Sequence, residues 1–417
     1  MKPLNILYVV PYAPTLIRVR PYNLIRFLQR AGHRVTLATL VEADGERESL
    51  AALAGEGARV IAEPISRWRK LANALRAAPT RTPLQAMYSW QPRLAGAIRT
   101  ALGEAAKANA GFDVVHVEHL RGARYALDVA MWAAANGRRP PVVWDSVDCI
   151  SHLFEQAARS SRSLFGRLVT RLELSRTRRY EGWLVGRFDR VLVTSTVDRQ
   201  TLTSLAAALD GEDYSERVVV LSNGVDLDYF TPVAAGREPA TIVFTGKMSY
   251  HANLTAALYL IEQVMPLVWQ HRPDAKLVIA GSSPPDRLRR LAAGHAGRVE
   301  VTGKVPDLRP YLTRASVAVA PLLYGAGVQN KVLEAMACAT PVVTTTRAVM
   351  GLWPEGLRHC AIADTPQAFA DGIAAFIVDA DRQRRAGEGG RRYVEMYHNW
   401  SAIVSDLAAI YHGLTRN

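Results

Sequence analysis

The stretch that decides the fold is "ASVAVAPLLYGAGVQNKVLEAMACATPVVTTT", residues 315–346. It begins with a β-branched, strand-like run (315–323), passes through a loop that contains Gly325 and Gly327, and then changes to helical spacing before a second β-branched run. The order strand, glycine loop, helix, strand is typical of parallel strands that are buried on both faces and connected by helices. The segment therefore predicts an α/β unit.

Short apolar strands alternate with helices in two separate series along the chain. The first series of predicted strands covers 4–10, 33–40, 112–118, 140–146, 189–195 and 216–224. The second series covers 240–246, 275–281, 297–303, 315–321 and 340–345. This repetition predicts an α/β fold with two doubly wound, Rossmann-like parallel-sheet domains, in which ligands bind at the carboxyl ends of the strands and in a cleft between the domains.

The domain boundary is placed by a turn-rich segment without periodicity, residues 223–241. The predicted domains are therefore 1–222 and 223–396. A final helix, 397–417, is a candidate to pack back on the N-terminal domain, with Ser401 as its predicted N-cap.

The composition of the chain bears on the cellular compartment in which the protein is expected. The 417 residues contain no apolar run that approaches the ~20 residues of a membrane span, and the first residues lack a secretory signal pattern. The three cysteines, Cys149, Cys338 and Cys360, are odd in number and far apart, so neither a disulfide framework nor a zinc site is indicated. We expect a reducing, cytoplasmic location.

The net charge of +13 predicts an anionic partner: a phosphorylated small molecule or an anionic membrane. Nucleic acid is disfavoured, because no basic stripe is interleaved with aromatic residues. The arginines concentrate in two segments, 66–81 and 158–180. In the second segment, helical spacing is shared by Leu164, Phe165, Leu168 and Leu172. Two readings stay open: a basic helix on the inner face of the cytoplasmic membrane, or a solvated helix packed on its own domain.

A candidate anion site lies where the helix of the opening stretch begins. If that helix starts near Gln329, its first amides and the positive end of its dipole face the glycine loop, an arrangement suited to a diphosphate. Lys331 and Glu334 project from roughly one face of the helix, and a carboxylate there could accept the hydroxyls of a ribose. The alternative is an ordinary surface ion pair between these two side chains. The candidate ligand-binding residues of this segment are Gly327, Val328, Gln329, Asn330, Lys331 and Glu334.

A second candidate for phosphate binding is Lys247, which follows Gly246 at the end of the first strand of the second domain. The chain contains neither a G-x-G-x-x-G nor a G-x-x-x-x-G-K-[ST] pattern. Dinucleotide-dependent oxidoreductases and P-loop nucleotidases are therefore disfavoured.

Several segments resemble the family 4 glycosyltransferases of the GT-B fold. They are "NGVDLDYF" (223–230), "FTGKMSYHANLTAALYLIEQVMP" (244–266), "VTGKVPDLRPYLTRASVAVAP" (301–321) and "VLEAMACATPVV" (332–343). More narrowly, the chain resembles sugar transferases of exopolysaccharide gene clusters associated with exosortase (PEP-CTERM) systems. That likeness rests on "GVQNKVLEAMA" (327–337), "VRPYNLIRFL" (19–28) and "DRVLVTSTVDR" (189–199).

The resemblance implies a retaining, metal-independent transfer that needs no cofactor. The donor would be a UDP- or GDP-linked sugar bound on the second domain, and the acceptor a glycan or lipid-linked molecule on the first, in exopolysaccharide or cell-surface glycan biosynthesis. By matching position, Lys247 would meet the diphosphate, the loop from Gly327 to Gln329 would meet phosphate and sugar, and Glu334 would hold the ribose.

The chain departs from the family pattern in the second domain. Ala326 stands in place of the first glutamate of the family's pair, which contacts the donor sugar. The second basic residue of the diphosphate site falls on Ala252 or Asn253, and we predict that Lys331 replaces its charge.

The first domain departs from the pattern as well. Glu118 stands where the second histidine of the family's His-x-His is expected, and His119 follows it; these two residues are the predicted catalytic candidates, whereas His116 is expected to point into the sheet. Arg18 and Arg20 replace a frequent glycine pair in the predicted acceptor-side loop.

Two other functions stay open on the same fold. A nucleotide-sugar epimerase or hydrolase would act on the donor without an acceptor. A non-catalytic partner subunit would bind the nucleotide without turnover, which the missing glutamate at Ala326 would explain.

Overall fold

The computed structural model describes residues 2–15, 18–43, 45–108, 110–137, 139–160, 164–233, 236–324 and 328–415; side chains are described for these ranges except for 156–160 and 164–170. The chain divides into two compact units. The first unit combines Met1–Ser222 with Trp400–Asn417, and the second is Asn223–Asn399.

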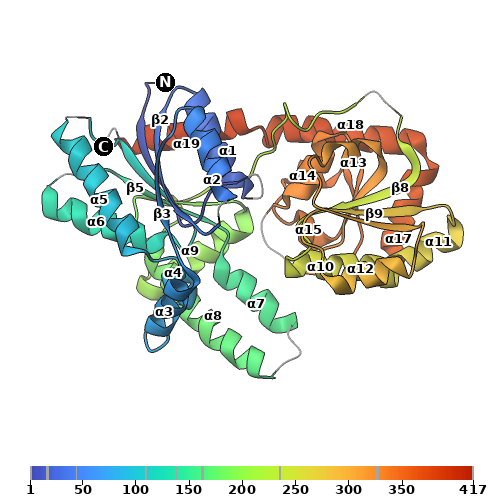
Figure 1. The fold of residues 1–417 in the computed structure, drawn as a ribbon, viewed down its shortest axis with the longest axis horizontal. Coiled ribbons are helices and arrows are strands. Elements are labelled where there is room, and N and C mark those ends of the chain that lie inside the picture. Colours follow the sequence, from blue (N-terminus) through green and yellow to red (C-terminus); the bar gives the residue numbers. More distant parts are fainter. Residues whose placement is uncertain are drawn as a thin grey trace. The chain divides into compact units, whose positions relative to one another are not determined.

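The first unit is built on a seven-stranded sheet in the order β3-β2-β1-β4-β5-β6-β7, with all neighbouring strands parallel (Figure 1). Its strands are β1 (Asn5–Val10), β2 (Arg34–Val41), β3 (Arg59–Pro64), β4 (Val114–Glu118), β5 (Val142–Val147), β6 (Arg190–Val193) and β7 (Val218–Val220). The interior strand β1 pairs Ile6 with Val35 of β2 on one side and with Val114 of β4 on the other. Buried apolar residues point to both faces of the sheet from β1, as expected for an interior strand of a parallel sheet.

Helices cover both faces of this sheet. They are α1 (Val19–Arg30), α2 (Glu46–Gly55), α3 (Arg67–Ala77), α4 (Leu84–Tyr88), α5 (Pro92–Lys107), α6 (Ala123–Asn136), α7 (Ile150–Ser160), α8 (Leu164–Val185), α9 (Thr196–Asp210) and α19 (Trp400–Thr415). One core cluster joins the sheet to α5, α6, α8 and α9, and another joins its other face to α1, α2 and α19. The sheet is therefore buried on both sides.

The last helix of the described chain, α19, belongs to the core of the first unit. Trp400, Leu407 and Tyr411 are fully buried there, and the Tyr411 hydroxyl lies 2.7 Å from Nδ1 of His116 on β4. The helix begins at Trp400, three residues later than the segment predicted from sequence.

The second unit contains a six-stranded parallel sheet in the order β10-β9-β8-β11-β12-β13. Its strands are β8 (Glu238–Thr245), β9 (Lys276–Ala280), β10 (Val299–Gly303), β11 (Ala315–Ala320), β12 (Val342–Thr344) and β13 (Cys360–Ile362). Its helices are α10 (His251–Tyr259), the π-helical turn η1 (Leu260–Val264), α11 (Met265–His271), α12 (Asp286–Ala293), α13 (Arg309–Arg314), α14 (Asn330–Ala337), α15 (Thr346–Val349), α16 (Pro354–Leu357), α17 (Pro366–Val378) and α18 (Ala380–Tyr397). A single core cluster runs through this unit.

The predicted fold class is confirmed: two doubly wound parallel sheets. The sequence analysis missed one edge strand in each sheet, β3 and β13. The arginine-rich segment 158–180 covers the end of α7 and most of α8. Of its four apolar positions, Leu164, Phe165 and Leu168 lie outside the described side chains, and Leu172 is exposed. Within the described ranges, the helices are too short or too polar to span a bilayer.

Candidate functional site

The second sheet reverses its winding between β8 and β11, which are neighbours at its centre. In doubly wound folds, ligands bind in the crevice beyond the carboxyl ends of the strands at this switch point. Lys247 follows β8, and α14, with Lys331 in its first turn, follows β11. The topology therefore brings the two predicted phosphate-binding segments to the same edge of one sheet.

Glycines allow the backbone of β8 and β9 to approach closely at this edge. Gly246 and Gly281 have φ values of 149° and 150°, a conformation that residues with a side chain rarely adopt. A Cβ on Gly281 would lie 1.8 Å from the carbonyl oxygen of Gly246. A Cβ on Gly246 would lie 2.7 Å from Nδ2 of Asn253 and 3.3 Å from Nζ of Lys331. The close packing at the ends of β8 and β9 therefore requires glycine at both positions.

The Lys331 side chain reaches from α14 to α10. Its ammonium donates to Oδ1 of Asn253 over 2.5 Å and lies 4.5 Å from the centroid of the Phe244 ring. The Asn253 amide in turn donates to the carbonyl oxygen of Lys247 over 3.0 Å. The positive charge of Lys331 is therefore held beside Asn253, one of the two positions where the family pattern has its second basic residue.

Lys331 and Glu334 do not form the ordinary surface ion pair that was the alternative interpretation. Neither side chain is fully exposed, and among the described residues no ion pair joins them. Burial lowers the pKa of Lys331 to about 7, although Glu334 counteracts the shift. Burial raises the pKa of Glu334 to about 7, against the opposing effect of Lys331. Within the described chain the Glu334 carboxylate accepts no side-chain or backbone hydrogen bond, so its oxygens remain available to hydroxyl donors.

The start of α14 also carries a polar group without a partner. Gln329 is the N-cap residue in an extended conformation, and the preceding Val328 is buried in the core. Oδ1 of Asn330 is buried and has no hydrogen-bond partner in the described part of the chain. Gly327, and Ala326 before it, lie outside the described residues.

Lys247, by contrast, is exposed at the end of β8. Its side chain forms no ion pair with a carboxylate of the described residues. Within this part of the chain, Lys247 therefore presents an unpaired side chain at the strand end that Lys331 approaches from α14.

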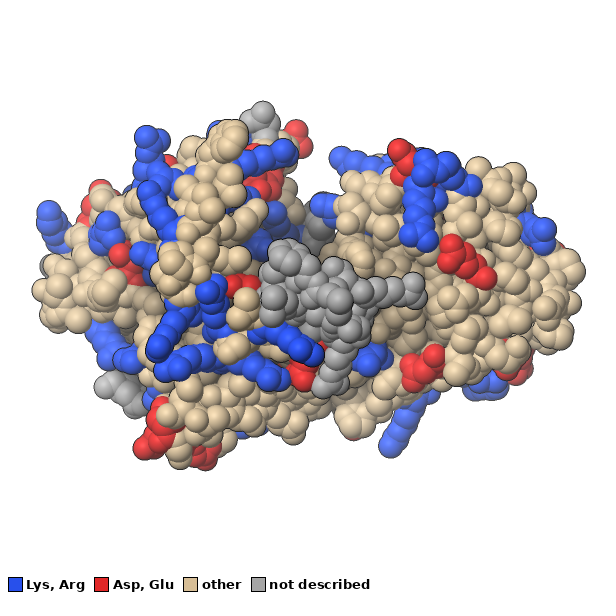
Figure 2. All heavy atoms as spheres, turned by 90° about the horizontal axis from the view of Figure 1, so that it is seen from below, with Lys and Arg blue, Asp and Glu red and all other residues tan. Residues whose placement is uncertain are grey.

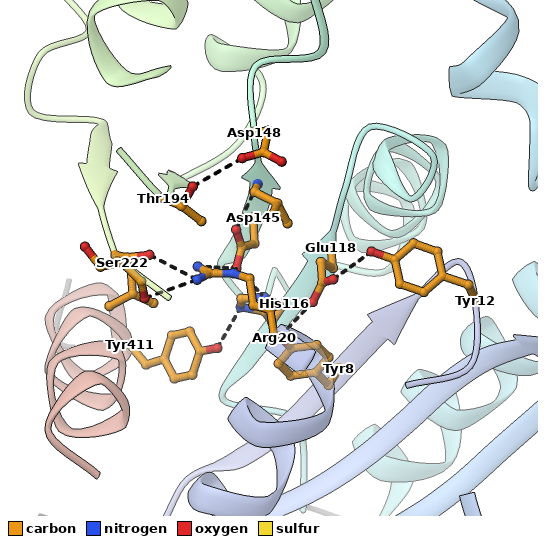
Figure 3. Close-up of polar contacts among 12 residues, drawn as sticks. Tyr8, Tyr12, Arg20, His116, Glu118, Asp145, Asp148, Thr194, Ser222 and Tyr411 are labelled. Atoms are coloured by element: carbon orange, nitrogen blue, oxygen red, sulfur yellow. Dashed lines mark hydrogen bonds and ion pairs between the residues drawn. The ribbon is translucent and has the colours of Figure 1, made fainter. Parts of the chain in front are cut away.

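The corresponding switch point of the first sheet lies between β1 and β4. Glu118, the last residue of β4, is only 1% exposed. Its carboxylate accepts hydrogen bonds from Tyr12 at 2.8 Å and from Tyr8 at 3.3 Å (Figure 3). Burial, and then the charge of Asp145, raise its pKa to about 8. Glu118 is therefore an internal group in this structure, which argues against its direct contact with a sugar.

Arg20 does not lie in the loop after β1, where the sequence analysis placed it. It is the second residue of α1, is 4% exposed, and forms an ion pair with Asp145 on β5 with both Nε and Nη2 at 2.8 Å from Oδ2 (Figure 3). Nη1 donates to the carbonyl oxygens of Leu221 and Ser222. Burial opposes ionisation of Asp145, but Arg20 and then His116 outweigh it, so the pKa of Asp145 is lowered. Arg20 is a structural cation.

His116 is buried in the sheet, as the sequence analysis expected. Its ring stacks on Tyr8 at 4.2 Å, and its Nε2 lies 3.6 Å from Asp145. Together with Tyr411, it connects β4 to α19.

His119 is the catalytic candidate that remains partly accessible. It has a φ of 67°, and its amide donates to the carbonyl oxygen of Asp145. Burial, and then the charge of Arg121, lower its pKa to about 3, so the imidazole is neutral near pH 7. Because Nδ1 accepts a hydrogen bond from the Arg121 amide, the proton of the neutral ring lies on Nε2. Nε2 has no partner among the described residues and is a donor for a ligand.

Arg18, the N-cap residue of α1, is one-third exposed. Its guanidinium donates to Ala13 and Glu46 and lies over the Tyr12 ring at 4.8 Å. It remains near the end of β1 but is already held by these contacts.

The sequence analysis missed the residues that organise both sites. Asn253 was noted only as a position where the family pattern has a basic residue and this chain does not. Tyr8, Tyr12 and Asp145 were not singled out. Their partners are separated by 78 to 125 residues, so no local pattern could reveal them. Within the described chain, no group of three or more His, Cys, Asp or Glu side chains is arranged to hold a metal ion.

Solved structures with the same architecture define the class. The HepE protein of Anabaena, in a complex with UDP-glucose, matches 98% of this chain and 100% of its own with a TM-score of 0.67 and 14% identity. A glycosyltransferase from Rickettsia africae ESF-5 matches 100% of both chains with a TM-score of 0.67 and 15% identity. The protein therefore has the GT-B fold of two Rossmann-like units.

The family follows from the sequence comparisons. A family model described as "Glycosyl transferase 4-like domain" matches residues 17–224, and one described as "Glycosyl transferases group 1" matches residues 239–379. The chain belongs to the family 4 glycosyltransferases. It is also 29% identical, over 227 residues, to the phosphatidyl-myo-inositol mannosyltransferase of Mycobacterium tuberculosis. That match spans 52% of this chain and only 59% of the relative.

Proposed function

We propose that the protein transfers a sugar from a UDP- or GDP-linked donor to a glycan or lipid-linked acceptor, with retention at the anomeric carbon and without an obligatory metal or cofactor. The observation that carries the proposal is the Lys331 ammonium, held at the end of β8 by Asn253. A cation in that place, beside the exposed Lys247, suits a nucleoside diphosphate. The ligands named for the structures of HepE, UDP and UDP-glucose, support this class of ligand.

The proposed chemistry follows from the charges. Lys247, Lys331 and the amides at the start of α14 would neutralise the diphosphate as it leaves, and they would act most strongly where water is excluded. Glu334, with an unpaired carboxylate, would accept the ribose hydroxyls. His119 would donate from Nε2 to an oxygen of the sugar or acceptor.

The biological setting is proposed from the resemblance of residues 327–337 to exosortase-associated sugar transferases. We place the activity in exopolysaccharide or cell-surface glycan biosynthesis, in the cytoplasm or on the inner face of the cytoplasmic membrane. The phosphatidyl-myo-inositol mannosyltransferase of M. tuberculosis, by its name, acts on a lipid, and this favours a lipid-linked acceptor.

The donor site is tested by calorimetric titration of UDP and GDP into the wild-type protein and into Lys331→Ala and Glu334→Ala. Each substitution should weaken nucleotide binding at least tenfold, because a charge-assisted hydrogen bond contributes about 1.5–3 kcal/mol. Lys304→Ala and Glu300→Gln, which change exposed residues of the same unit, are matched controls and should bind as wild type. If Lys331→Ala and Glu334→Ala both stay within twofold of wild type on folded protein, the site is misplaced.

Product analysis separates the three candidate activities. Donor sugar incubated with the protein alone should be stable, and a glycosylated product with a retained anomeric configuration should form only with an acceptor. Conversion of the donor without an acceptor would indicate an epimerase or hydrolase. Tight nucleotide binding with no product across a broad acceptor panel would indicate a non-catalytic subunit.

A further inference from the structure

Helix α3 packs on the first unit through its polar face. Lys70 is buried, forms an ion pair with Glu42 and lies over the Tyr88 ring. Asn73 is 1% exposed and donates to the carbonyl oxygens of Tyr88 and Trp90 at 3.3 and 2.8 Å. The side of the helix that faces the protein is thus formed by a lysine, an asparagine and an alanine, Ala77.

The apolar side chains of α3 face solvent. Trp68 is 80% exposed, Leu71 51% and Leu75 66%. Their spacing of three and four residues places them on one face of the helix, opposite to Lys70 and Asn73. A surface helix of a globular protein normally buries its apolar stripe, so the polarity of α3 is inverted. A solvent-facing stripe that begins with an almost fully exposed tryptophan indicates an external apolar partner.

Arginines surround this stripe. Arg67 and Arg76 are exposed on α3, at positions that flank the stripe on its two sides. The end of α3 contacts α8, because Nη2 of Arg176 donates to the carbonyl oxygen of Ala78. Near this contact α8 exposes Arg171, Leu172 and Arg179. Figure 2 shows many Lys and Arg side chains on the face of the first unit that carries these helices.

We propose that α3 docks on an anionic lipid bilayer, with Trp68, Leu71 and Leu75 inserted among the acyl chains and with Arg67 and Arg76 among the headgroups. An interfacial helix of this kind combines a Trp- and Leu-containing face with flanking basic residues. Tryptophan favours the boundary between headgroups and acyl chains, and the arginines match the charge of anionic lipids. The docking surface gives the proposed transferase access to a lipid-linked acceptor, and only that purpose rests on the proposed function.

Charge and size favour a bilayer over a second copy of this chain. In a twofold symmetric contact centred on α3, the same basic surface would face itself, and like charges would oppose the contact. The exposed face of an 11-residue helix is also small beside the roughly 800 Å² that each partner buries in a stable interface.

The test is co-sedimentation of the full chain with vesicles of phosphatidylcholine that contain one third phosphatidylglycerol. The wild type should bind these vesicles at least tenfold more tightly than vesicles of phosphatidylcholine alone. The triple variant Trp68→Ser/Leu71→Ser/Leu75→Ser and the double variant Arg67→Gln/Arg76→Gln should each lose at least tenfold in binding to the anionic vesicles. Because all five side chains are exposed, the variants should fold normally, which circular dichroism verifies.

The matched control replaces three exposed apolar residues outside α3: Met131→Ser/Val378→Ser/Met396→Ser, at sites 66%, 72% and 69% exposed. It should bind as wild type. The proposal is overturned if the wild type does not bind anionic vesicles or if the α3 triple variant binds them as well as the control. It is also overturned if sedimentation without lipid shows a dimer that only the α3 variant loses.

Titration of UDP and GDP into the same proteins separates this proposal from the proposed function. Vesicle binding without nucleotide binding would support the docking surface and contradict the proposed transferase function. If the wild type and all variants bind nucleotide but none of them binds vesicles, only the docking proposal is contradicted.

Discussion

Lys331 and Glu334 lie three residues apart on α14, and the pKa of each is shifted to about 7 from opposite directions. Lys331 therefore loses its charge as the pH rises through about 7, and Glu334 loses its charge as the pH falls through about 7. A diphosphate needs the charged ammonium, and a ribose is held best by the charged carboxylate. If the donor binds at the proposed site, the same helix turn sets both an alkaline and an acid limit for its binding.

The expected result is a nucleotide affinity that is highest near pH 7 and falls on both sides. Calorimetric titration of UDP from pH 5 to pH 9 measures it. In Glu334→Gln the difference from wild type should be large at pH 8 and vanish toward pH 5, where Glu334 is already protonated. Titration of the diphosphate itself affects both proteins equally, so it cancels in the ratio of their two affinities. A ratio that is constant over the whole range would mean that Glu334 does not titrate in contact with the ligand.

Arg20 and Asp145 give a second prediction at this scale. Arg20→Met leaves the Asp145 carboxylate buried without its cation, and removal of one partner of a buried pair costs about 3–5 kcal/mol. Hydrogen exchange of the β4 and β5 amides should report a loss of this size in the stability of the first unit. Arg18→Met is the matched control, because its ion pair with Glu46 is partly exposed and worth about 1 kcal/mol or less. Equal losses in the two variants would contradict the structural role of Arg20.

Sequence reasoning singled out Lys247, Lys331 and Glu334 because glycine, lysine and carboxylate occur at strand–helix junctions. Their assignment to a donor site stays a prediction, and their contacts could not be predicted from the sequence. The bond from Lys331 to Asn253 depends on two helices brought together by the sheet. The burial of Glu118 was missed for the same reason, since the tyrosines that cover it come from β1 and the segment after it.

At the scale of whole elements, α8 and α9 are in contact at a glycine. A Cβ on Gly182 would lie 2.5 Å from the carbonyl oxygen of Leu205 in α9. Gly182→Ala should therefore push the helices apart and destabilise the first unit by about 1–3 kcal/mol. Gly103→Ala in α5 is the matched control: nothing lies within 4 Å of its Cβ, so it should stabilise by about 0.5–1 kcal/mol. Thermal unfolding of both variants measures the difference, and a stabilised Gly182→Ala would contradict the close packing.

The two strands that the sequence analysis missed, β3 and β13, each lie at an edge of their sheet. β3 has only exposed and half-buried residues and ends in Glu63 and Pro64. β13 has only three residues, none of them fully buried. A strand at the edge of the sheet lacks the continuous apolar run that marked the central strands. The other two edge strands, β7 and β10, are also only partly buried, but they were predicted because β7 consists of valines and β10 has valines at alternate positions.

At the scale of the whole molecule, the first unit is formed by two distant parts of the chain. A chain that ends at residue 399 loses the buried Trp400, Leu407 and Tyr411 from the core of this unit. We expect the first unit to unfold at a much lower temperature in that truncated chain, because each of these large side chains contributes a few kcal/mol when buried. The second unit contains all of Asn223–Asn399 and should keep its nucleotide affinity.

Two measurements on the truncated chain check this: hydrogen exchange across β1 to β7, and titration of UDP and GDP. Protected β1 to β7 amides would show that α19 is dispensable for the first core. If nucleotide binding is lost when the first unit unfolds, the donor site needs the first unit as well as the second.

The position of α19 also has a consequence for the order of events during synthesis. Residues 1–222 leave the ribosome first, but their core stays open until the ribosome has added residues 223–399 and then α19. At about 5–20 residues per second, this delay is roughly 10–40 s. During that time the face of the first sheet that α19 covers, including His116 and the apolar side of α1, is exposed to solvent. The nascent first unit should accordingly be a client for chaperones that bind exposed apolar strands, while the second unit can fold as soon as it emerges.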